Sequence, residues 1–447
     1  MANFSFKRGL DIPIAGSPKQ EISEGQHPKF MAVKGTDFIG LKPKMLVSEG
    51  DLVEKGSPLF CNKDHPDVIF VSPCKGHVHS INRGEKRVLL SVIIKVADLE
   101  AKSPNFIKQN KSIKSEKEFI RKCLLDSGLW TSFLTRPYSK IPNPDSEPSS
   151  IFITALDTEP LSPDADIIIE DSLDNFIEGV KQVAKLTNGK VFVCSKDDNQ
   201  LNLDDCEVHG FKGPHPAGLV GTHIHFLDAP NSSKTVWTIG YQDIISIGKL
   251  FLSGYLQTEK VISISGPLAK NPRLVRTFEG ASLKDLLHDE FINDDTCRVI
   301  SGSILSGEVA EGELSYLGKY SRQVTLIHED RKKIPFGWIK PQPNKFSVMP
   351  VLISALRSSK LFNLTSNLNG GRRAMVPTGV FETLMPQDFL PTQLLRSLLV
   401  MDTDTAQSLG ALELAEEDLA LATFACPAKY EYGSALRDCL HKIEKEG

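Results

Sequence analysis

The sequence predicts a multidomain α/β protein, and three changes of pattern along the chain carry that prediction. Short strand-like segments separated by glycine turns fill residues 31–96. From residue 150, apolar β-branched runs alternate with a helical pattern, and after about residue 346 only helical periodicity remains. We therefore expect, in chain order, an N-terminal β barrel-sandwich over residues 1–100, a Rossmann-like α/β domain over 101–255, a β-grasp domain over 256–335 and a helical C-terminal domain over 336–447.

Two glycine-containing segments support the barrel-sandwich, because Met45–Leu59 and Val71–Ile81 resemble each other. Their pattern, Gly-Asp-x-Val-x-x-Gly-x-x-Leu and then Ser-Pro-x-x-Gly-x-Val, is similar to that of lipoyl/biotinyl-type domains. A swinging-arm carrier of that type needs a lysine at the tip of its exposed hairpin. Lys63, in the predicted hairpin, lies too close to Leu59 for that role, so we expect a structural module.

The α/β domain is predicted from a helix and a strand–helix–strand unit. An amphipathic helix is expected over residues 115–123, with Ser115 as its N-cap and acidic residues in its first turn. Ile151–Ile153 and Val191–Val193 are short apolar runs typical of buried strands. Residues 174–186 between them have helical spacing that a glycine turn closes. This order predicts a βαβ unit and a parallel sheet.

The last two domains are predicted in the same way. Strand-like runs and a helix capped by Ser282 follow one another over residues 261–305, an order that resembles the soluble-ligand-binding β-grasp family. Beyond them, Pro350 can open a helix that carries Val351 and Leu356 among its apolar residues. Further apolar stripes predict helices at residues 394–399, 406–409 and 416–424, and a last helix capped by Ser434.

Two groups of histidines raise the question of a metal site. His77 and His79 would lie on one face of a strand, where we expect an exposed polar surface rather than metal ligands. Residues 210–218 form a loop rich in glycine and proline, which we expect at the ligand-binding edge of the sheet. We predict no metal site there; the alternative is a cluster formed by His215, His223 and His225.

Composition argues against several classes of protein. The net charge of −4 gives no reason to expect nucleic-acid binding. The eight cysteines contain no Cys-x-x-Cys pair, which argues against a disulfide framework, an iron–sulfur cluster and a structural zinc. No apolar run approaches the ~20 residues that span a bilayer, and the start lacks a signal-like apolar core. We therefore expect a cytosolic chain that reaches a membrane only through a partner.

The segment after the first predicted helix is the most informative part of the sequence for function. A flavin or dinucleotide domain needs glycines in a turn near such a strand, so that backbone N–H groups can approach a phosphate closely. Here Gly128 is followed by bulky side chains, namely Leu129, Trp130, Phe133 and Leu134. We expect an α/β domain of flavin-binding ancestry whose phosphate cradle has been filled in.

Motifs spread across nearly the whole chain resemble one family, the A subunit of the sodium-translocating NADH:quinone oxidoreductase. The matching segments are, in order, Lys7–Gly16, Lys42-Pro43-x-Met45, Ser127–Trp130, Arg136-Pro137, Gly213–Gly218, Thr235–Trp237, Ile239–Asp243, Met375–Pro377 and Cys426–Gly433. The resemblance implies a peripheral subunit on the cytoplasmic face of the bacterial inner membrane, in a six-subunit complex that oxidises NADH, reduces ubiquinone and exports Na⁺. Its implied partners are the other subunits, chiefly a membrane subunit, and ubiquinone.

The chain departs from the flavin-binding relatives of that family at three places. The resemblance extends to the flavin subunit of respiratory complex I and to a subunit of the ferredoxin:NAD oxidoreductase, which carry a glycine-rich loop where this chain has residues 128–138. They also carry an acidic residue where this chain has Ala217–Val220, and a cysteine-rich cluster domain where it keeps only Cys426 and Cys439. The departures imply that this subunit binds no flavin, NADH or iron–sulfur cluster, although the complex uses them.

Three hypotheses of function follow. A slot shaped for a flavin ring can accept a flat quinone head, with Trp130, Phe133 and Tyr138 as stacking faces and Arg136 or Tyr138 as a hydrogen-bond donor. In the alternative interpretation of the same residues, the aromatic rings only plug the old cavity. The second hypothesis is a scaffold subunit without a ligand, because no redox or catalytic group of residues is evident. The third keeps a flavoprotein dehydrogenase.

Overall fold

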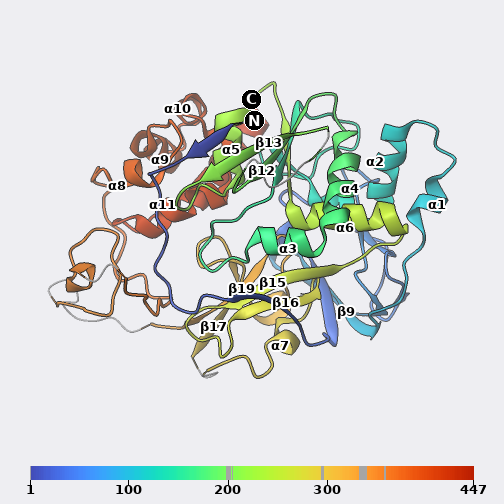
Figure 1. Cartoon of the computed structure of the whole chain (residues 1–447), viewed down its shortest axis with the longest axis horizontal. Coiled ribbons are helices and arrows are strands. Elements are labelled where there is room, and N and C mark those ends of the chain that lie inside the picture. Colours follow the sequence, from blue (N-terminus) through green and yellow to red (C-terminus); the bar gives the residue numbers. More distant parts are fainter. Residues whose placement is uncertain are drawn as a thin grey trace.

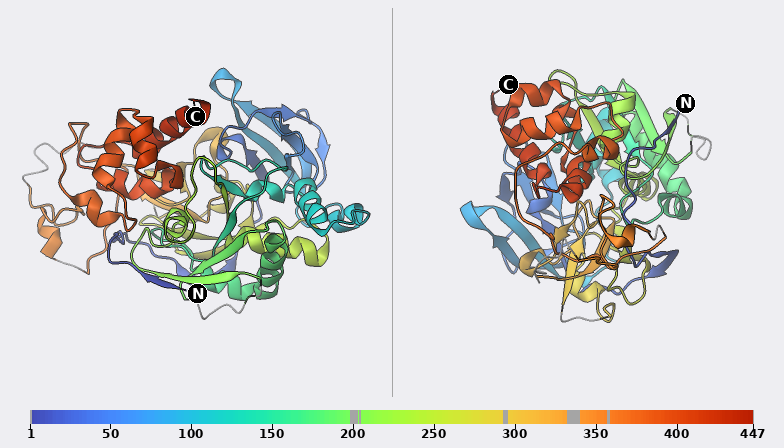
Figure 2. Two further views of the ribbon diagram at one scale, coloured as in Figure 1. Left: turned by 90° about the horizontal axis from the view of Figure 1, so that it is seen from above. Right: turned by 90° about the vertical axis from the view of Figure 1, so that its left-hand side faces the viewer.

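The computed structural model describes residues 2–197, 203, 205–292, 296–331, 340–356 and 359–446. The molecule is a mixed α/β structure in which the C-terminal helices gather at one end (Figure 1). In the left-hand view of Figure 2, these helices (red) lie on the left, and the strands between residues 30 and 98 (lighter blue) lie at the upper right. Among the described residues, no helix is both long and apolar enough to cross a membrane. The predicted boundary between residues 335 and 336 lies outside the described residues.

The N-terminal domain consists of short strands in two sheets of order β3-β9-β8-β5 and β4-β6-β7. Phe60 and Phe70 stack in its core with ring centroids 4.5 Å apart. His77 and His79 are exposed on one face of β8, with Val78 buried between them, as the sequence predicts. The strands are β3 (Phe30–Lys34), β4 (Pro43–Met45), β5 (Leu52–Val53), β6 (Pro58–Asn62), β7 (Ile69–Val71), β8 (Lys75–Arg83) and β9 (Leu89–Asp98).

The α/β domain is built on a sheet of order β1-β13-β12-β11-β14-β10, parallel except for the edge strand β10. The predicted βαβ unit is confirmed, because β11 leads through α4 to the neighbouring parallel strand β12. The strand order reverses between β11 and β14, which is where ligands bind in doubly wound sheets. The elements are α1 (Phe106–Asn110), α2 (Glu116–Asp126), β10 (Leu134–Arg136), β11 (Ser150–Thr154), α3 (Ala165–Asp171), α4 (Leu173–Ala184), β12 (Lys190–Ser195), β13 (Glu207–Lys212), α5 (Val220–Leu227), β14 (Val236–Gly240) and α6 (Tyr241–Ser253).

The third domain is a mixed sheet of order β18-β17-β19-β15-β16-β2. Ser282 caps its short helix as predicted, with Oγ accepting a hydrogen bond from Asp285 N (3.3 Å). The elements in chain order are β15 (Glu259–Ser265), β16 (Arg273–Phe278), α7 (Leu283–Leu286), β17 (Cys297–Ser301), β18 (Glu308–Val309) and β19 (Gln323–His328).

The first 24 residues differ from the prediction, because they contribute strands to the second and third domains. β1 (Asn3–Ser5) pairs in parallel with β13, and β2 (Lys19–Glu24) pairs in parallel with β16. Both pairings join residues more than two hundred positions apart, so no local pattern in the sequence reports them. The chain enters the barrel-sandwich only at β3.

The C-terminal helices pack around one core, which also takes in Ile12, Ile14, Leu161, Ile300 and Ile327 from earlier parts of the chain. The helix predicted from Pro350 is wrong: residues 350–356 contain only a 3₁₀ turn at Ile353–Leu356, and no core covers Leu356, which is 84% exposed. The last helix begins at Tyr432, so Ser434 lies within its first turn and does not cap it. The helices are α8 (Val380–Leu384), α9 (Pro391–Leu399), α10 (Thr403–Ser408), α11 (Ala420–Ala425) and α12 (Tyr432–Glu446).

Candidate functional site

The turn that follows α2 is fixed against the barrel-sandwich. Ser115 Oγ accepts a hydrogen bond from Glu118 N (3.5 Å), so the helix begins at the predicted cap. Gly128 ends the helix in the left-handed conformation, with a φ of +76°. A Cβ at this position would lie 2.8 Å from Val71 Cγ2, so the close approach to β7 also requires glycine.

Three backbone N–H groups of this turn donate to carbonyl groups of the turn or of the last turn of α2. Gly128 N donates to Leu125 O (3.1 Å), and Thr131 N donates to Gly128 O (3.3 Å). Phe133 N likewise donates to Trp130 O (3.3 Å). A phosphate cradle needs several N–H groups that point together into open space. These three N–H groups are therefore not free to bind the phosphate of a flavin or dinucleotide.

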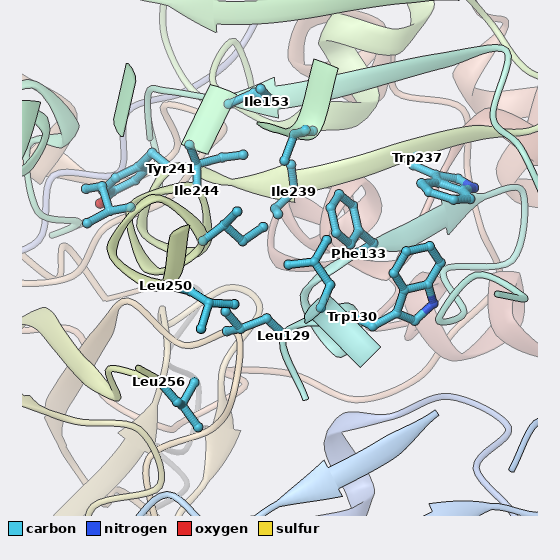
Figure 3. Close-up of a cluster of buried hydrophobic side chains, with 14 of the residues drawn as sticks. Leu129, Trp130, Phe133, Ile153, Trp237, Ile239, Tyr241, Ile244, Leu250 and Leu256 are labelled. Carbon is cyan, nitrogen blue, oxygen red and sulfur yellow. The ribbon is translucent and has the colours of Figure 1, made fainter. Parts of the chain in front are cut away.

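Trp130 and Phe133 lie in the hydrophobic core, beside Trp237 of β14 (Figure 3). Trp130 is 1% exposed and Phe133 is fully buried. Trp237 meets the Trp130 ring edge-on, with centroids 5.4 Å apart, and its centroid lies 5.7 Å from that of Phe133. Trp130 Nε1 donates a hydrogen bond to Pro142 O (2.9 Å). In this conformation, protein atoms cover the faces of both predicted stacking rings.

Arg136 and Tyr138 contact the helical C-terminal domain instead. The Arg136 side chain is 1% exposed, and its Nη2 lies 2.7 Å from Glu417 Oε1. Its Nη1 donates to Ser139 Oγ (2.8 Å). Tyr138 packs against the C-terminal core, its carbonyl accepts a hydrogen bond from Arg437 Nη1 (2.7 Å), and burial raises the pKa of its phenol. The four predicted residues therefore form two separate pairs and do not line one pocket.

Side chains from other domains occupy the edge of the sheet where a ligand would be expected. Asp157, which follows β11, pairs with Arg322 of the third domain (3.2 Å). The Arg322 guanidinium lies 5.0 Å from the centroid of the Tyr241 ring. On α5, a Cβ at Gly221 would lie 2.3 Å from Asp418 Oδ1, so a carboxylate of the helical domain sits beside the first turn of that helix. These contacts join three domains at the carboxyl-terminal edge of the sheet.

The histidines of residues 215–225 have separate partners. Burial lowers the pKa of His215 to about 4 and that of His223 to about 3, so both rings are neutral near pH 7. Among the described residues, no group of three or more His, Cys, Asp or Glu side chains is placed to hold a metal ion. The nearest polar partners are Thr158 Oγ1 for His215 (3.3 Å), Ala217 O for His223 (3.1 Å) and Glu413 Oε2 for His225 (2.8 Å).

A cleft lies beside the turn that follows α2, where the barrel-sandwich, the α/β domain and the third domain meet. Its volume is about 60 Å³, and it opens to solvent. The apolar part of its wall comes from all three domains. This wall includes Phe38 and Phe70 of the barrel-sandwich, Leu129 of the α/β domain, and Leu256 and Leu317 of the third domain.

The polar part of the cleft wall is a chain of paired charges. Lys34 Nζ lies 3.2 Å from Asp37 Oδ1 and 2.6 Å from Glu308 Oε2, and the lysine side chain is 2% exposed. Lys319 N donates to Asp37 Oδ2 (2.7 Å), and its Nζ donates to Glu279 Oε1 (2.8 Å). Two ammonium groups are therefore fixed beside an apolar wall.

The carboxylates around the cleft keep both lysines charged. Burial alone would lower the pKa of Lys34, but Asp37 and Glu308 outweigh it and raise that pKa above its ordinary value. Burial also works against Lys319, whose pKa is nevertheless raised by Glu279 and by Asp243. Because an ammonium has three N–H donors, each lysine can serve its carboxylates and still donate to a further acceptor.

Reasoning from the sequence missed Lys34, Asp37 and Lys319. One signal was present. Lys34 directly follows the apolar run Phe30–Val33, so it extends a strand that is expected to be buried, and a buried lysine needs a charged partner. The approach of Lys319 to Asp37 joins residues 282 positions apart, so only the folded chain reveals it.

Comparison with known proteins adds independent information about all parts of the chain. Models of the NqrA family match residues 4–97 (N-terminal barrel-sandwich hybrid domain), 115–256 (second alpha/beta domain) and 261–312 (NQRA C-terminal domain). These matches confirm the predicted barrel-sandwich and α/β domain. An NAD⁺-reducing [NiFe]-hydrogenase of known structure is 11% identical, with a TM-score of 0.39 over 78% of this chain and 67% of its own, which is too distant to bear on function.

Curated relatives match over almost the full length. The A subunit of the Na(+)-translocating NADH-quinone reductase of Histophilus somni (strain 2336) is 49% identical, and the match covers 99% of this chain and 100% of the relative. The protein of the same name from Vibrio atlanticus (strain LGP32) is 48% identical, with 99% and 100% covered. The chain therefore belongs to the NqrA family, the A subunit of the Na(+)-translocating NADH-quinone reductase.

Proposed function

We propose that this chain is the quinone-contacting subunit on the cytoplasmic side of a complex that couples quinone reduction to Na⁺ export, and that quinone binds in the cleft beside Leu129. The observation that supports this proposal is an apolar cleft with two ammonium groups in its wall, of which Lys34 is buried and Lys319 is partly buried. A quinone head is a flat apolar ring with two carbonyl acceptors. Phe38 and Leu129 supply apolar contact, and Lys34 and Lys319 supply N–H donors to the carbonyls.

The four residues predicted from the sequence are not in the cleft wall but stabilise the parts of the chain next to it. Trp130 and Phe133 pack in the same core as Leu129, so they hold the apolar wall in place. Arg136 and Tyr138 fix the end of the turn on the helical domain. A volume of about 60 Å³ is smaller than a substituted quinone ring needs, so binding must move the walls apart.

We also propose that the chain carries no redox cofactor of its own and docks on a membrane subunit of the complex. Three N–H groups of the turn after α2 are engaged within the protein, and Arg322 and Asp418 occupy the sheet edge where a nucleotide would be expected. On this proposal, electrons reach the quinone from other subunits, and the Na⁺ path also lies in them.

The proposal predicts that a short-chain ubiquinone quenches the tryptophan fluorescence of the purified chain saturably. Trp130 lies between two cleft residues in sequence, so it is the expected reporter, and Trp130→Phe should reduce the change. Lys319→Gln should weaken binding at least about 10-fold, because a hydrogen bond from a charged donor contributes about 1.5–3 kcal/mol. Lys140→Gln is the matched control, because it removes a lysine paired with Glu444 on the helical domain.

Two results would contradict the quinone site. One is the absence of saturable quenching; the other is an equal loss of affinity in the Lys319 and Lys140 variants. The scaffold hypothesis would then stand, and it predicts that the remaining subunits fail to assemble without this chain. The purified chain should also be extracted by heat and the visible spectrum of the extract recorded. Stoichiometric flavin in that extract would instead support the dehydrogenase hypothesis.

A further inference from the structure

One stretch of the chain has a charge balance unlike that of the rest. From residue 331 to residue 381 the sequence contains no Asp or Glu but nine Lys and Arg residues. This leaves 43 Lys and Arg against all 56 Asp and Glu in the rest of the chain. The cations are Arg331, Lys332, Lys333, Lys340, Lys345, Arg357, Lys360, Arg372 and Arg373. A protein that is acidic elsewhere therefore concentrates positive charge in one segment.

The described cations of this segment from residue 340 onward have no carboxylate partner among the described residues, although ion pairs are frequent elsewhere in the structure. Lys360 Nζ donates to Pro343 O (2.7 Å) and Asn344 Oδ1 (2.6 Å), both neutral groups. Arg373 Nε donates to Pro427 O (2.9 Å), also neutral. These charges are therefore available to an anion outside the protein.

Exposed apolar side chains gather in the same segment. Among the described residues, twelve large apolar side chains are more than half exposed, and six of them lie between residues 351 and 376. The most exposed is Leu356, at 84%. Isolated exposed aliphatic residues are ordinary. The presence of half of all the exposed ones within 26 residues of the chain needs an explanation. The six are Val351, Ile353, Leu356, Leu361, Leu368 and Val376.

Buried anchors hold this segment in place, so the exposed side chains are presented outward. Phe362 is 5% exposed, its N donates to Pro13 O (2.8 Å), and its carbonyl accepts from Ala15 N (2.9 Å). Ser366 N donates to His328 O (3.0 Å). In Figures 1 and 2 the described parts of the segment (orange) form loops that project at the end of the molecule beside the C-terminal helices.

We infer that residues 340–356 and 359–376 form a docking surface for an anionic lipid bilayer, in which the unpaired cations bind phosphate headgroups and the exposed aliphatic side chains enter the interface. The binding strength of such a surface grows both with its buried apolar area and with the attraction between its cations and anionic lipids. The exposed side chains in the described part of this segment combine cations with aliphatic groups, which is the chemistry of a surface that binds anionic lipid. This inference goes beyond the quinone proposal and does not depend on it.

The test is cosedimentation of the purified full-length chain with vesicles at low and physiological salt. Vesicles with about one third phosphatidylglycerol in phosphatidylcholine should bind the chain, and pure phosphatidylcholine should not. Lys340→Gln with Arg372→Gln should weaken binding about 30-fold, because each cation near an anionic surface contributes about 1 kcal/mol. Lys111→Gln with Lys114→Gln is the matched control, because it removes two exposed cations elsewhere.

A second pair of variants tests the apolar contribution at constant charge. Val351→Ser with Leu356→Ser should weaken binding, whereas Leu52→Ser with Leu252→Ser should not, although all four residues are more than half exposed. Equal binding to both kinds of vesicle, or equal effects of test and control variants, would overturn the inference. Binding only to membranes that contain the other subunits would also overturn it and would assign the surface to a protein partner.

Discussion

Trp130→Ala is expected to lower the free energy of unfolding by about 3–5 kcal/mol, the usual cost of removing a large aromatic side chain from a packed core. The ring is 1% exposed and contacts Phe133 and Trp237, so the neighbours cannot close the space it would leave. The variant also leaves Pro142 O without the indole N–H that it accepts. Urea unfolding followed by far-UV circular dichroism measures the effect.

Leu252→Ala is the control for this measurement, because Leu252 is 59% exposed and its truncation should cost less than about 0.5 kcal/mol. A loss below about 1 kcal/mol in Trp130→Ala would show that the indole lies in a loosely packed space. That outcome would return it to the role of a stacking face for quinone. The expected large loss would instead restrict Trp130 to holding the wall of the cleft.

Arg136→Met is expected to destabilise the docking of the helical domain by about 3 kcal/mol, because removing one partner leaves an uncompensated buried charge. Arg136 is 1% exposed, its Nη2 lies 2.7 Å from Glu417 Oε1, and the fully buried Asp418 lies 4.0 Å away. Glu417 is 35% exposed, so solvent reduces the penalty on its side. Limited proteolysis between residues 340 and 380, together with urea unfolding, measures the loss of docking.

The double variant Arg136→Met with Glu417→Gln should recover part of that loss, because it removes both charges of the pair. Arg8→Met is the matched control, since Arg8 is exposed and should tolerate the same change. If Arg136→Met matched the control, the ion pair would contribute nothing to the contact between the domains. Arg136 would then be free to act as a donor to a ligand.

The sequence correctly predicted those helices and strands that depend on interactions between neighbouring residues. Ser115 and Ser282 cap helices as expected, and Ile151–Ile153 and Val191–Val193 form adjacent buried strands. The helix predicted from Pro350 does not form. Apolar residues at helical spacing stabilise a helix only when a core covers them, and no core covers these residues. Ser434 failed as a cap because Tyr432 begins the helix two residues earlier.

The site could be predicted only in part, because its decisive contacts join distant residues. The filled turn at Leu129 and Trp130 is visible in the sequence as missing glycines. Whether a large ring in such a turn lines a pocket or fills a core depends on Trp237, which comes from another strand. The partner of Arg136 lies 281 positions away, so its burial in an ion pair has no local signature.

The placement of β1 and β2 has a consequence during synthesis on the ribosome. β2 pairs with β16, so it stays without a partner until about 250 further residues have emerged, roughly 10–50 s at usual rates of translation. An unpaired strand invites pairing with other nascent chains. The sequence of β2, Lys-Gln-Glu-Ile-Ser-Glu, is polar and charged, which suits a segment that must wait in water without aggregating.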